Sequence, residues 1–371
     1  MKKLLFITVI GLLSFTKSYT QDTKKVTFKV PLDNKEISIL LEKYMSSYPN
    51  NTQLSIALID DKNVTYIGVI RKNDVLETIE NQESSFEIGS ITKVFTSVLL
   101  ASQVNLGNMS LDDPIKNYLP FTLKNNSQEG VEITLKMLAN HTSGLPRVPS
   151  NIIEDLKKYK EDNPYRDYDS IRLNDYLKNE MKIDTIPGVK VSYSNLGAGL
   201  LGYILCLNTK QTFEDLLQQY IFKPLKMNNS STFVDERTII KGQDLNGNEI
   251  ANWDLNVLSG AGSIKSTAKD MTKFALKNIE GGTYYDLVQE PTFKINEWRK
   301  MGLGWNITDI EEENIHVYYH NGGTGGYRSN MIVSRKNKIG VIILSNVSAY
   351  SEPAESIDQL SRELMGILRA K

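Results

Sequence analysis

The sequence reads Phe86-Glu87-Ile88-Gly89-Ser90-Ile91-Thr92-Lys93 at the point where an extended run turns through a glycine into an apolar helix. Helix positions i and i+3 lie on one face, so this spacing predicts that the Lys93 amine lies beside the Ser90 hydroxyl. A serine hydroxyl is a poor nucleophile unless a base takes its proton. Apolar surroundings lower the pKa of a lysine, and the neutral amine can then act as that base. The stretch therefore predicts a nucleophilic serine paired with a lysine.

The same Ser-x-x-Lys spacing occurs three times in the chain, at Ser14 to Lys17, Ser90 to Lys93 and Ser266 to Lys269. The first copy lies in a predicted signal peptide. The third is typical of a helix start that is capped by its serine. Capping is also the alternative interpretation of Ser90, so the catalytic interpretation depends on further motifs.

A second motif, Tyr193-Ser194-Asn195, closes the short extended run Val189 to Tyr193 and opens a helix. From such a turn a phenol can relay a proton, and an amide can hold a substrate amide. Alternatively, Tyr193 packs in the core, and Ser194 or Asn195 only caps the helix.

A third motif, His320-Asn321-Gly322-Gly323-Thr324-Gly325-Gly326, follows a strand-like run. Its glycines would let the backbone approach a ligand closely. An edge strand here could bind an extended substrate, and its N–H groups could stabilise an oxyanion. A flexible loop is the alternative. A phosphate-binding loop is disfavoured, because the Gly-Lys-Ser/Thr ending and the following helix are missing.

Two other enzyme classes are disfavoured. Gly197 to Gly202 matches G-x-G-x-x-G, but the next element, Thr212 to Phe222, has the pattern of a helix capped by Thr212 where a dinucleotide-binding unit needs a strand. We expect these glycines to allow close helix packing instead. A Ser-His-Asp triad based on His141 or His320 is disfavoured because the chain has no G-x-S-x-G elbow. We expect His141 to shape its loop by hydrogen bonding.

The composition excludes several partners. The chain has 371 residues, a formal net charge of −1 and no basic stripe, which argues against binding to nucleic acid. The single cysteine, Cys206, cannot form an internal disulfide and is predicted to be buried. The three histidines, His141, His316 and His320, fall at no ligand-like spacing, so we expect no metal and no cofactor.

The N-terminus is typical of a secretory signal peptide, with Met1-Lys2-Lys3 followed by an apolar run from Leu4 to about Phe15. The run is shorter than the roughly 20 apolar residues that span a membrane. We expect a signal peptide over residues 1–20 and an exported mature chain, 21–371, that is periplasmic or extracellular and has no transmembrane segment.

Runs rich in β-branched residues at both ends of the chain predict one antiparallel sheet. The predicted fold class is α/β, with helices flanking a sheet formed by about residues 21–108 and 256–371, and a mainly helical inserted domain over about 109–255. Within the insert, the charged and tyrosine-rich stretch 154–169 is expected at the surface. The predicted strands are Leu54 to Ile59 and Val64 to Ile70, which form a hairpin, and Ile315 to Tyr319, Met331 to Ser334 and Ile339 to Leu344; an amphipathic helix follows over 353–368.

Taken in order, Ser90-x-x-Lys93, Tyr193-x-Asn195 and His320-x-Gly322 resemble the motifs of the serine β-lactamase and penicillin-binding protein superfamily. The chain is most similar to the class C branch and the related D-Ala-D-Ala carboxypeptidases and esterases. The resemblance covers nearly all of the predicted mature chain and implies a β-lactamase/transpeptidase-like fold. Its supporting stretches are Leu111-Asp112-Asp113-Pro114, Asn140 to Pro146, Ser266 to Phe274, Gly302-Leu303-Gly304-Trp305 and Gly322 to Gly326.

The resemblance implies roles for the residues of the first two motifs. Ser90 would be the acylated nucleophile and Lys93 its base. Tyr193 would carry protons during acylation, and Asn195 would contact the side-chain amide of the substrate. No cofactor is implied.

For the third motif, the resemblance implies a substrate-binding strand at His320, Asn321, Gly322 and Gly323. The backbone N–H groups of Ser90 and Gly323 would form the oxyanion hole. Many relatives have Lys-Thr-Gly where this chain has His-Asn-Gly. A histidine binds a carboxylate only when it is protonated, and its ordinary pKa is about 6.5. The departure therefore predicts weaker recognition of a substrate carboxylate and less efficient β-lactam hydrolysis.

The leading hypothesis is an exported serine hydrolase that acts through an acyl-serine intermediate on β-lactams or on D-Ala-D-Ala peptides of the cell wall. Its partner would be a small-molecule or peptidoglycan-derived substrate. Two alternatives stay open: an esterase on the same scaffold, and a non-catalytic relative that binds peptides. The sequence predicts no oligomeric state.

Overall fold

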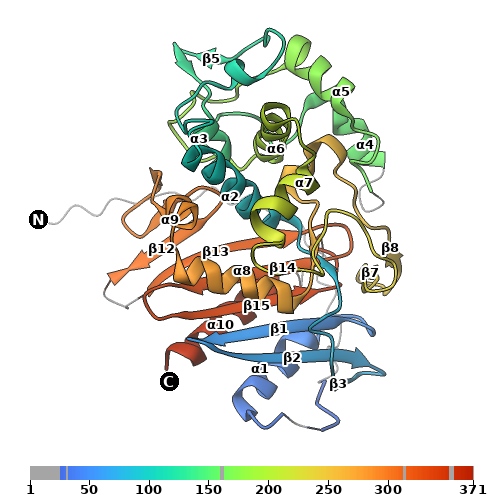
Figure 1. Ribbon diagram of the computed structural model, residues 1–371. Helices are drawn as coiled ribbons and strands as arrows, with labels where there is room; N and C mark the ends of the chain where they lie inside the picture. The colour runs from blue at the N-terminus through green and yellow to red at the C-terminus, as the bar shows by residue number, and fades with distance from the viewer. Residues whose placement is uncertain (1–25, 31, 159–162, 312–314, 351–354, 371) are drawn as a thin grey trace, which may run out of the picture.

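A computed structural model describes residues 26–30, 32–158, 163–311, 315–350 and 355–370, and the predicted signal peptide lies outside them. Its central feature is a nine-stranded antiparallel sheet with the strand order β10-β11-β12-β13-β14-β15-β1-β2-β3 (Figure 1). The strands are β1 (Gln53–Asp60), β2 (Asn63–Lys72), β3 (Val75–Ile79), β10 (Phe293–Lys294), β11 (Arg299–Met301), β12 (Asn306–Ile310), β13 (Ile315–Gly323), β14 (Arg328–Ser334) and β15 (Ile339–Ser345). Strand β1 lies between β2 and β15, with Leu54 opposite Ser345.

Strands from both ends of the chain complete the sheet, which confirms the predicted fold class. The hairpin of β1 and β2 is confirmed, and β13 to β15 cover the three predicted C-terminal strands. Strand β13 runs four residues further than predicted, because the segment from His320 to Gly323 continues its pairing with β14. Strands β3 and β10 to β12 were not predicted, because they are short and mostly lack an apolar alternation.

Helices cover both faces of the sheet (Figure 1). Helices α1 (Lys35–Met45) and α10 (Glu355–Arg369) lie on one face. The predicted apolar stripe of α10 is buried there, at Ile357, Leu360, Leu364 and Leu368. Helix α8 (Ala268–Glu280) packs on the other face, against β1, β14 and β15. The sheet thus separates two hydrophobic clusters.

The middle of the chain is mainly helical and lies beyond α8 (Figure 1). Helix α2 (Thr92–Asn105) is buried from Thr92 to Gln103 and joins this part to the sheet. Its Phe95 ring stacks on Phe274 of α8, with ring centres 3.7 Å apart, so both parts share one core. The boundaries at residues 109 and 255 stay a prediction.

The remaining elements are short or peripheral to the sheet. The other α-helices are α3 (Leu135–Ala139), α4 (Ile153–Lys158), α5 (Ser170–Asp175), α6 (Asn195–Thr209), α7 (Phe213–Leu217) and α9 (Tyr284–Gln289). The 3-10 helices are η1 (Gly89–Ile91), η2 (Ile115–Tyr118), η3 (Ser150–Ile152) and η6 (Asn256–Ala261). Two π-helical turns are η4 (Tyr176–Glu180) and η5 (Gln218–Phe222). Three strand pairs lie outside the large sheet: β4 (Phe86–Glu87) with β9 (Lys265–Ser266), β5 (Ser127–Gln128) with β6 (Val131–Glu132), and β7 (Gly242–Gln243) with β8 (Glu249–Ile250).

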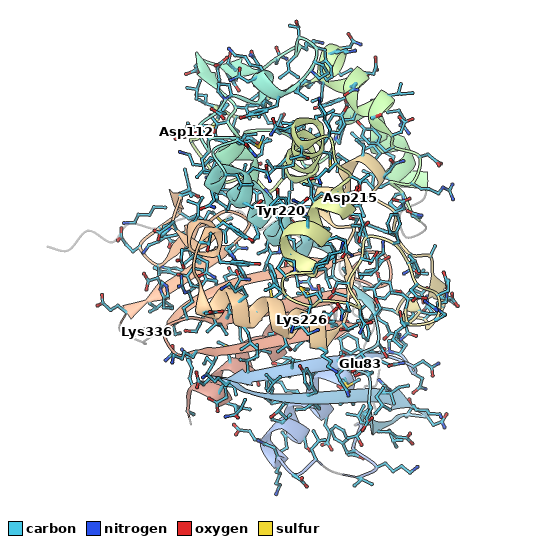
Figure 2. All side chains as sticks on the ribbon, in the orientation of Figure 1. Glu83, Asp112, Asp215, Tyr220, Lys226 and Lys336 are labelled. Carbon is cyan, nitrogen blue, oxygen red and sulfur yellow. The ribbon has the colours of Figure 1, made fainter. Side chains whose placement is uncertain are left out.

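Two predictions about helices are confirmed. Thr212 caps α7 in a reciprocal capping box with Asp215, which is labelled in Figure 2. The glycines of α6 allow close packing, because a Cβ added at Gly202 would lie 2.9 Å from the Gly260 Cα. The glycine pattern in this helix therefore serves packing against η6.

Other local predictions were wrong. Thr267, not Ser266, caps α8, because Ser266 still pairs in β9. Cys206 is only half-buried. Within the stretch expected at the surface, Tyr165 and Tyr168 are buried, since they pack into the core of the helical part.

No helix in the described part of the chain is long and apolar enough to cross a membrane.

Candidate active site

Ser90 lies where β4 ends and the single turn η1 leads into α2. This turn lies directly against the end of β13. A Cβ added at Gly89, whose φ is +50°, would lie 2.5 Å from the Gly323 nitrogen, and one added at Gly322 would overlap the Ile88 carbonyl oxygen. The Ser329 hydroxyl also donates to that carbonyl, at 2.8 Å. Glycine at these positions therefore lets the serine turn and the strand meet backbone to backbone.

The Lys93 amine points back to Ser90, as the spacing predicts. Its Nζ lies 2.9 Å from Ser90 Oγ and donates to the Ala261 carbonyl at 2.6 Å. The lysine side chain is only 2% exposed. Burial, with a smaller effect of the Arg147 charge, lowers the pKa of Lys93 well below its ordinary value. Because an uncharged amine keeps a lone pair, Lys93 can take the Ser90 proton.

Tyr193 lies on the other side of the same pair. Its ring centre is 4.9 Å from Lys93 Nζ, and its hydroxyl is within hydrogen-bonding reach of Ser90. Burial raises the pKa of Tyr193 to about 12, although the Ser90 contact opposes this rise. At neutral pH the side chain is therefore a phenol that can donate a proton. Ser90, Lys93 and Tyr193 thus lie together around one hydroxyl group.

The residue after Tyr193 fixes its position. Ser194 caps α6 by accepting from the Gly197 N–H at 2.8 Å, and its hydroxyl donates to the Pro146 carbonyl at 2.6 Å. The Ser194 N–H donates to His141 Nδ1 at 3.3 Å. The loop that contains His141 and Pro146 is therefore tied to the start of α6.

His141 shapes its loop by hydrogen bonding, which confirms the prediction for this residue. The structure adds a contact that the sequence analysis missed: the His141 ring lies 4.4 Å from the Tyr193 ring, centre to centre. Burial lowers the pKa of His141 well below its ordinary value. A neutral imidazole thus packs on the phenol. Its backbone φ of 61° is unusual for a residue with a side chain.

Asn195 opens α6 beside Tyr193. Its Nδ2 lies 3.5 Å from the Tyr165 hydroxyl, while its Oδ1 is buried without a hydrogen-bond partner among the described residues. Tyr165 in turn packs on Trp253, with ring centres 5.4 Å apart. An amide oxygen that is buried and unpaired is available to accept from a ligand N–H. Neither aromatic residue was predicted to lie here, because both come from segments distant in sequence.

His320 lies in the site but is uncharged. It is 2% exposed, and its ring centre is 6.4 Å from that of Tyr193. Its Nδ1 donates to the Asn321 carbonyl at 2.6 Å, so Nε2 carries no proton in the neutral ring. Burial is the main cause that lowers the pKa of His320 to about 3. The residue therefore offers no positive charge to a substrate carboxylate at neutral pH.

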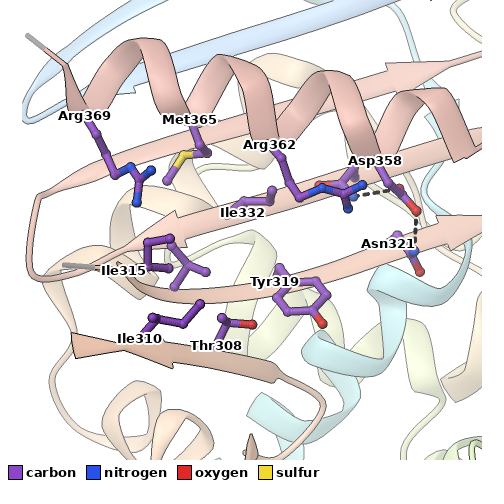
Figure 3. Close-up of a pocket in the computed structure, with 12 residues that line it drawn as sticks. Thr308, Ile310, Ile315, Tyr319, Asn321, Ile332, Asp358, Arg362, Met365 and Arg369 are labelled. Carbon is purple, nitrogen blue, oxygen red and sulfur yellow. Dashed lines mark hydrogen bonds between the residues drawn. The ribbon is translucent and has the colours of Figure 1, made fainter. Parts of the chain in front are cut away.

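The Asn321 side chain faces away from Ser90, which leaves only its backbone for the predicted substrate-binding strand. Neighbouring residues of a strand point to opposite faces. The Asn321 amide donates to Asp358 of α10 at 2.8 Å. Figure 3 shows this side chain at one end of a hollow between α10 and strands β12 to β14, with a volume of about 370 Å³. Neither Ser90 nor Lys93 lines that hollow.

A buried acidic side chain and a buried basic side chain lie beneath the serine turn. Glu87 of β4 is opposite Lys265 of β9, and both side chains are buried. Burial raises the pKa of Glu87 and lowers that of Lys265, while their mutual attraction opposes both shifts. Glu87 accepts from the Trp253 N–H at 2.7 Å, and Lys265 donates to the Trp253 carbonyl at 3.0 Å. The pair holds the strand that leads to Ser90.

In the described part of the chain, no cluster of three or more His, Cys, Asp or Glu side chains could hold a metal ion. The site is instead a set of hydroxyl, amine, phenol and amide groups around Ser90. Such a set can transfer an acyl group to serine without metal ligands.

Comparisons with known proteins agree with this chemistry. A family model described as "Beta-lactamase" matches residues 51–364. "Protein flp" of Staphylococcus aureus (strain MW2) is 24% identical over 301 residues, which are 76% of this chain and only 56% of that protein. "D-alanyl-D-alanine-carboxypeptidase/endopeptidase AmpH" of Escherichia coli (strain K12) is 25% identical over 307 residues, which are 76% of this chain and 77% of that protein.

Solved structures share the fold. A crystal structure titled "Beta-lactamase/D-alanine Carboxypeptidase" from Yersinia pestis, complexed with citrate, has a TM-score of 0.71 at 22% identity and covers 90% of this chain and 100% of its own. An octameric penicillin-binding protein homologue from Pyrococcus abyssi has a TM-score of 0.75 at 22% identity, and covers 92% of this chain and 78% of its own.

Proposed function

Because the chain belongs to the beta-lactamase family, we propose that it is an exported serine hydrolase that cleaves an amide or ester through an acyl-Ser90 intermediate. The observation that carries the proposal is the 2.9 Å approach of a buried Lys93 amine to the Ser90 hydroxyl. The substrate would be a β-lactam, a D-Ala-D-Ala peptide or a simple ester.

In the proposed acylation step, Lys93 takes the Ser90 proton while Oγ forms a bond to the substrate carbonyl carbon. The carbonyl π electrons move to its oxygen, and the backbone N–H groups of Ser90 and Gly323 stabilise that oxyanion. When the tetrahedral intermediate collapses, the bond to the leaving nitrogen or oxygen breaks. Tyr193 donates its proton to the leaving atom and is reprotonated by Lys93.

In the proposed deacylation step, water attacks the ester on Ser90. The Lys93–Tyr193 pair takes a proton from the water, and Ser90 Oγ leaves with a proton from the same pair. The acid is released and the serine is regenerated. Asn195 would hold the amide on the acyl side of the substrate through its unpaired Oδ1.

The neutral state of His320 supports an ester as the substrate over a β-lactam. β-Lactams carry a carboxylate next to the leaving nitrogen, and the neutral imidazole does not offset that charge. An ester without a leaving-side carboxylate has no such requirement. We therefore keep an esterase as the second candidate on the same site.

Labelling with a fluorescent penicillin tests the nucleophile. The expected result is a covalent adduct that peptide mass spectrometry locates on Ser90 and that a Ser90→Ala variant lacks. Turnover of nitrocefin, a D-Ala-D-Ala peptide and p-nitrophenyl butyrate then ranks the substrate classes. A Ser90→Ala variant that hydrolyses any of them at the wild-type rate refutes the assignment. Binding of peptide without turnover would instead support the non-catalytic alternative.

Export remains part of the proposal. We propose that residues 1–20 act as a signal peptide that is removed, although they lie outside the described residues. N-terminal sequencing of protein recovered from the periplasm or medium tests it. Recovery of full-length chain from the cytoplasm alone would contradict it.

A further inference from the structure

Arg147 lies at the edge of the site and was not predicted to have a role. It follows Gly144-Leu145-Pro146, is exposed, and places its guanidinium carbon 5.2 Å from the centre of the Tyr193 ring. No carboxylate whose side chain the structure describes forms an ion pair with it. A guanidinium without a counter-ion beside the reacting groups is available to bind an anionic ligand.

The other positive groups near Tyr193 are already used or uncharged. Lys93 is buried, with a pKa well below its ordinary value. Arg328 is ion-paired with Asp358 of α10. His320 is neutral at physiological pH. Among these described neighbours, Arg147 is therefore the cation that a substrate would meet.

The backbone fixes Arg147 next to Asn195. The Arg147 carbonyl accepts from the N–H groups of Asn195 and Leu196, at 2.9 and 3.1 Å. The preceding carbonyl, that of Pro146, accepts from the Ser194 hydroxyl. Arg147 and the unpaired Asn195 Oδ1 thus belong to one rigid corner of the site.

We propose that Arg147 binds a carboxylate on the acyl side of the substrate, so that the enzyme selects acyl groups that carry a negative charge. The proposal rests on the proposed function, since it takes the acyl side from the role of Asn195 there. The carboxylate would receive two N–H bonds from the planar guanidinium, while Asn195 accepts from a neighbouring substrate N–H. The selected class is an acyl donor with an acidic group, such as a peptide with a free side-chain or α-carboxylate.

Matched esters test the charge directly. The mono-p-nitrophenyl ester of adipic acid carries a carboxylate on its acyl chain, its methyl ester has nearly the same chain without the charge, and p-nitrophenyl aminocaproate carries a positive charge. Wild type should hydrolyse the adipate half-ester with the highest kcat/KM. Arg147→Met keeps an aliphatic side chain against Tyr193, and should lower kcat/KM for the half-ester by roughly 10- to 100-fold, mainly through KM.

For the methyl ester, Arg147→Met should leave kcat/KM nearly unchanged. Arg147→Glu should reverse the preference toward the aminocaproate, and Arg147→Lys should restore part of the half-ester activity. Lys336→Gln removes a positive charge from the exposed turn between β14 and β15 (Figure 2), and should change none of the three rates.

The other outcomes distinguish failure of the anion subsite from failure of the proposed function. An equal loss on charged and neutral esters would assign Arg147 to holding Tyr193 and would refute the anion subsite. Unchanged rates for all Arg147 variants would refute it as well. If wild type hydrolyses neither these esters nor nitrocefin nor a D-Ala-D-Ala peptide faster than Ser90→Ala does, the proposed function itself fails, and the anion subsite fails with it.

Discussion

Replacing Lys93 with methionine should separate activity from stability. Methionine fills nearly the same buried space but has no amine, so Ser90 loses the base that lies 2.9 Å from its hydroxyl. A positioned general base contributes about 10²- to 10⁴-fold to a rate. The acylation rate constant should therefore fall by that factor, which corresponds to about 3 to 5.5 kcal/mol of transition-state stabilisation.

Stability should change much less. The variant loses the hydrogen bond from Nζ to the Ala261 carbonyl, and an unpaired buried carbonyl costs about 1–3 kcal/mol. Against this, it no longer buries an amine whose pKa is lowered on folding. Between the lowered pKa of the folded state and about 10.4, the unfolded chain binds more protons at this lysine, so wild-type stability rises with pH. Lys93→Met lacks this increase of stability with pH. Its free energy of unfolding, compared with that of wild type, should therefore be greatest at the acidic end of that range.

The assay is a stopped-flow measurement of the p-nitrophenol burst, with urea unfolding at several pH values in parallel. Ser90→Ala is the matched control, because it removes the nucleophile and keeps the amine. An acylation rate for Lys93→Met within about threefold of wild type would falsify the role of the amine as base. If the free energy of unfolding of Lys93→Met changes with pH as steeply as that of wild type, the Lys93 amine does not have the lowered pKa that its burial implies.

Three further results are expected. The acylation rate should rise with pH as Lys93 loses its proton and then stay level, because Tyr193 does not ionise until about pH 12; a stopped-flow profile that falls earlier would contradict a neutral phenol. His320→Lys should raise kcat/KM for nitrocefin by about tenfold through its new charge and leave p-nitrophenyl butyrate unaffected, and an equal rise for both would argue against carboxylate recognition. Asp358→Ala leaves the partly buried Arg328 unpaired and should lower the free energy of unfolding in urea by about 3 kcal/mol, whereas a loss below about 1 kcal/mol would make the pair equivalent to a surface contact.

Local sequence patterns predicted the β1–β2 hairpin and helix α10 well. The hairpin before Ser90 is rich in β-branched and apolar residues around a polar turn, and the α10 stripe repeats at helical spacing, so each could be inferred from a few neighbouring residues. Strands β10 to β12 could not, because their position depends on pairing with β13 and not on their own pattern. The same is true of the tyrosines at 165 and 168, whose burial depends on distant partners.

In the candidate site, too, only the contacts between residues close in sequence could be predicted. The contact between Ser90 and Lys93 needs only three residues of helix, so the sequence predicts it. The packing of His141 and Arg147 on Tyr193 depends on a loop that is tied to α6 from far along the chain. The direction of the Asn321 side chain follows from strand alternation, but β13 was predicted to end before His320, so this direction was not inferred.

The pairing of β1 with β15 delays assembly of the protein. Strand β1 ends at Asp60, but its second neighbour, β15, begins only at Ile339, so β1 is synthesised long before this partner. Until then the hairpin has an open edge, which tends to pair with other chains, and contacts that span most of the chain form slowly. A chain interrupted before residue 339 carries Ser90, Lys93 and Tyr193 and yet lacks the strand that closes the sheet. Shortened products should therefore aggregate or be degraded rather than retain partial activity.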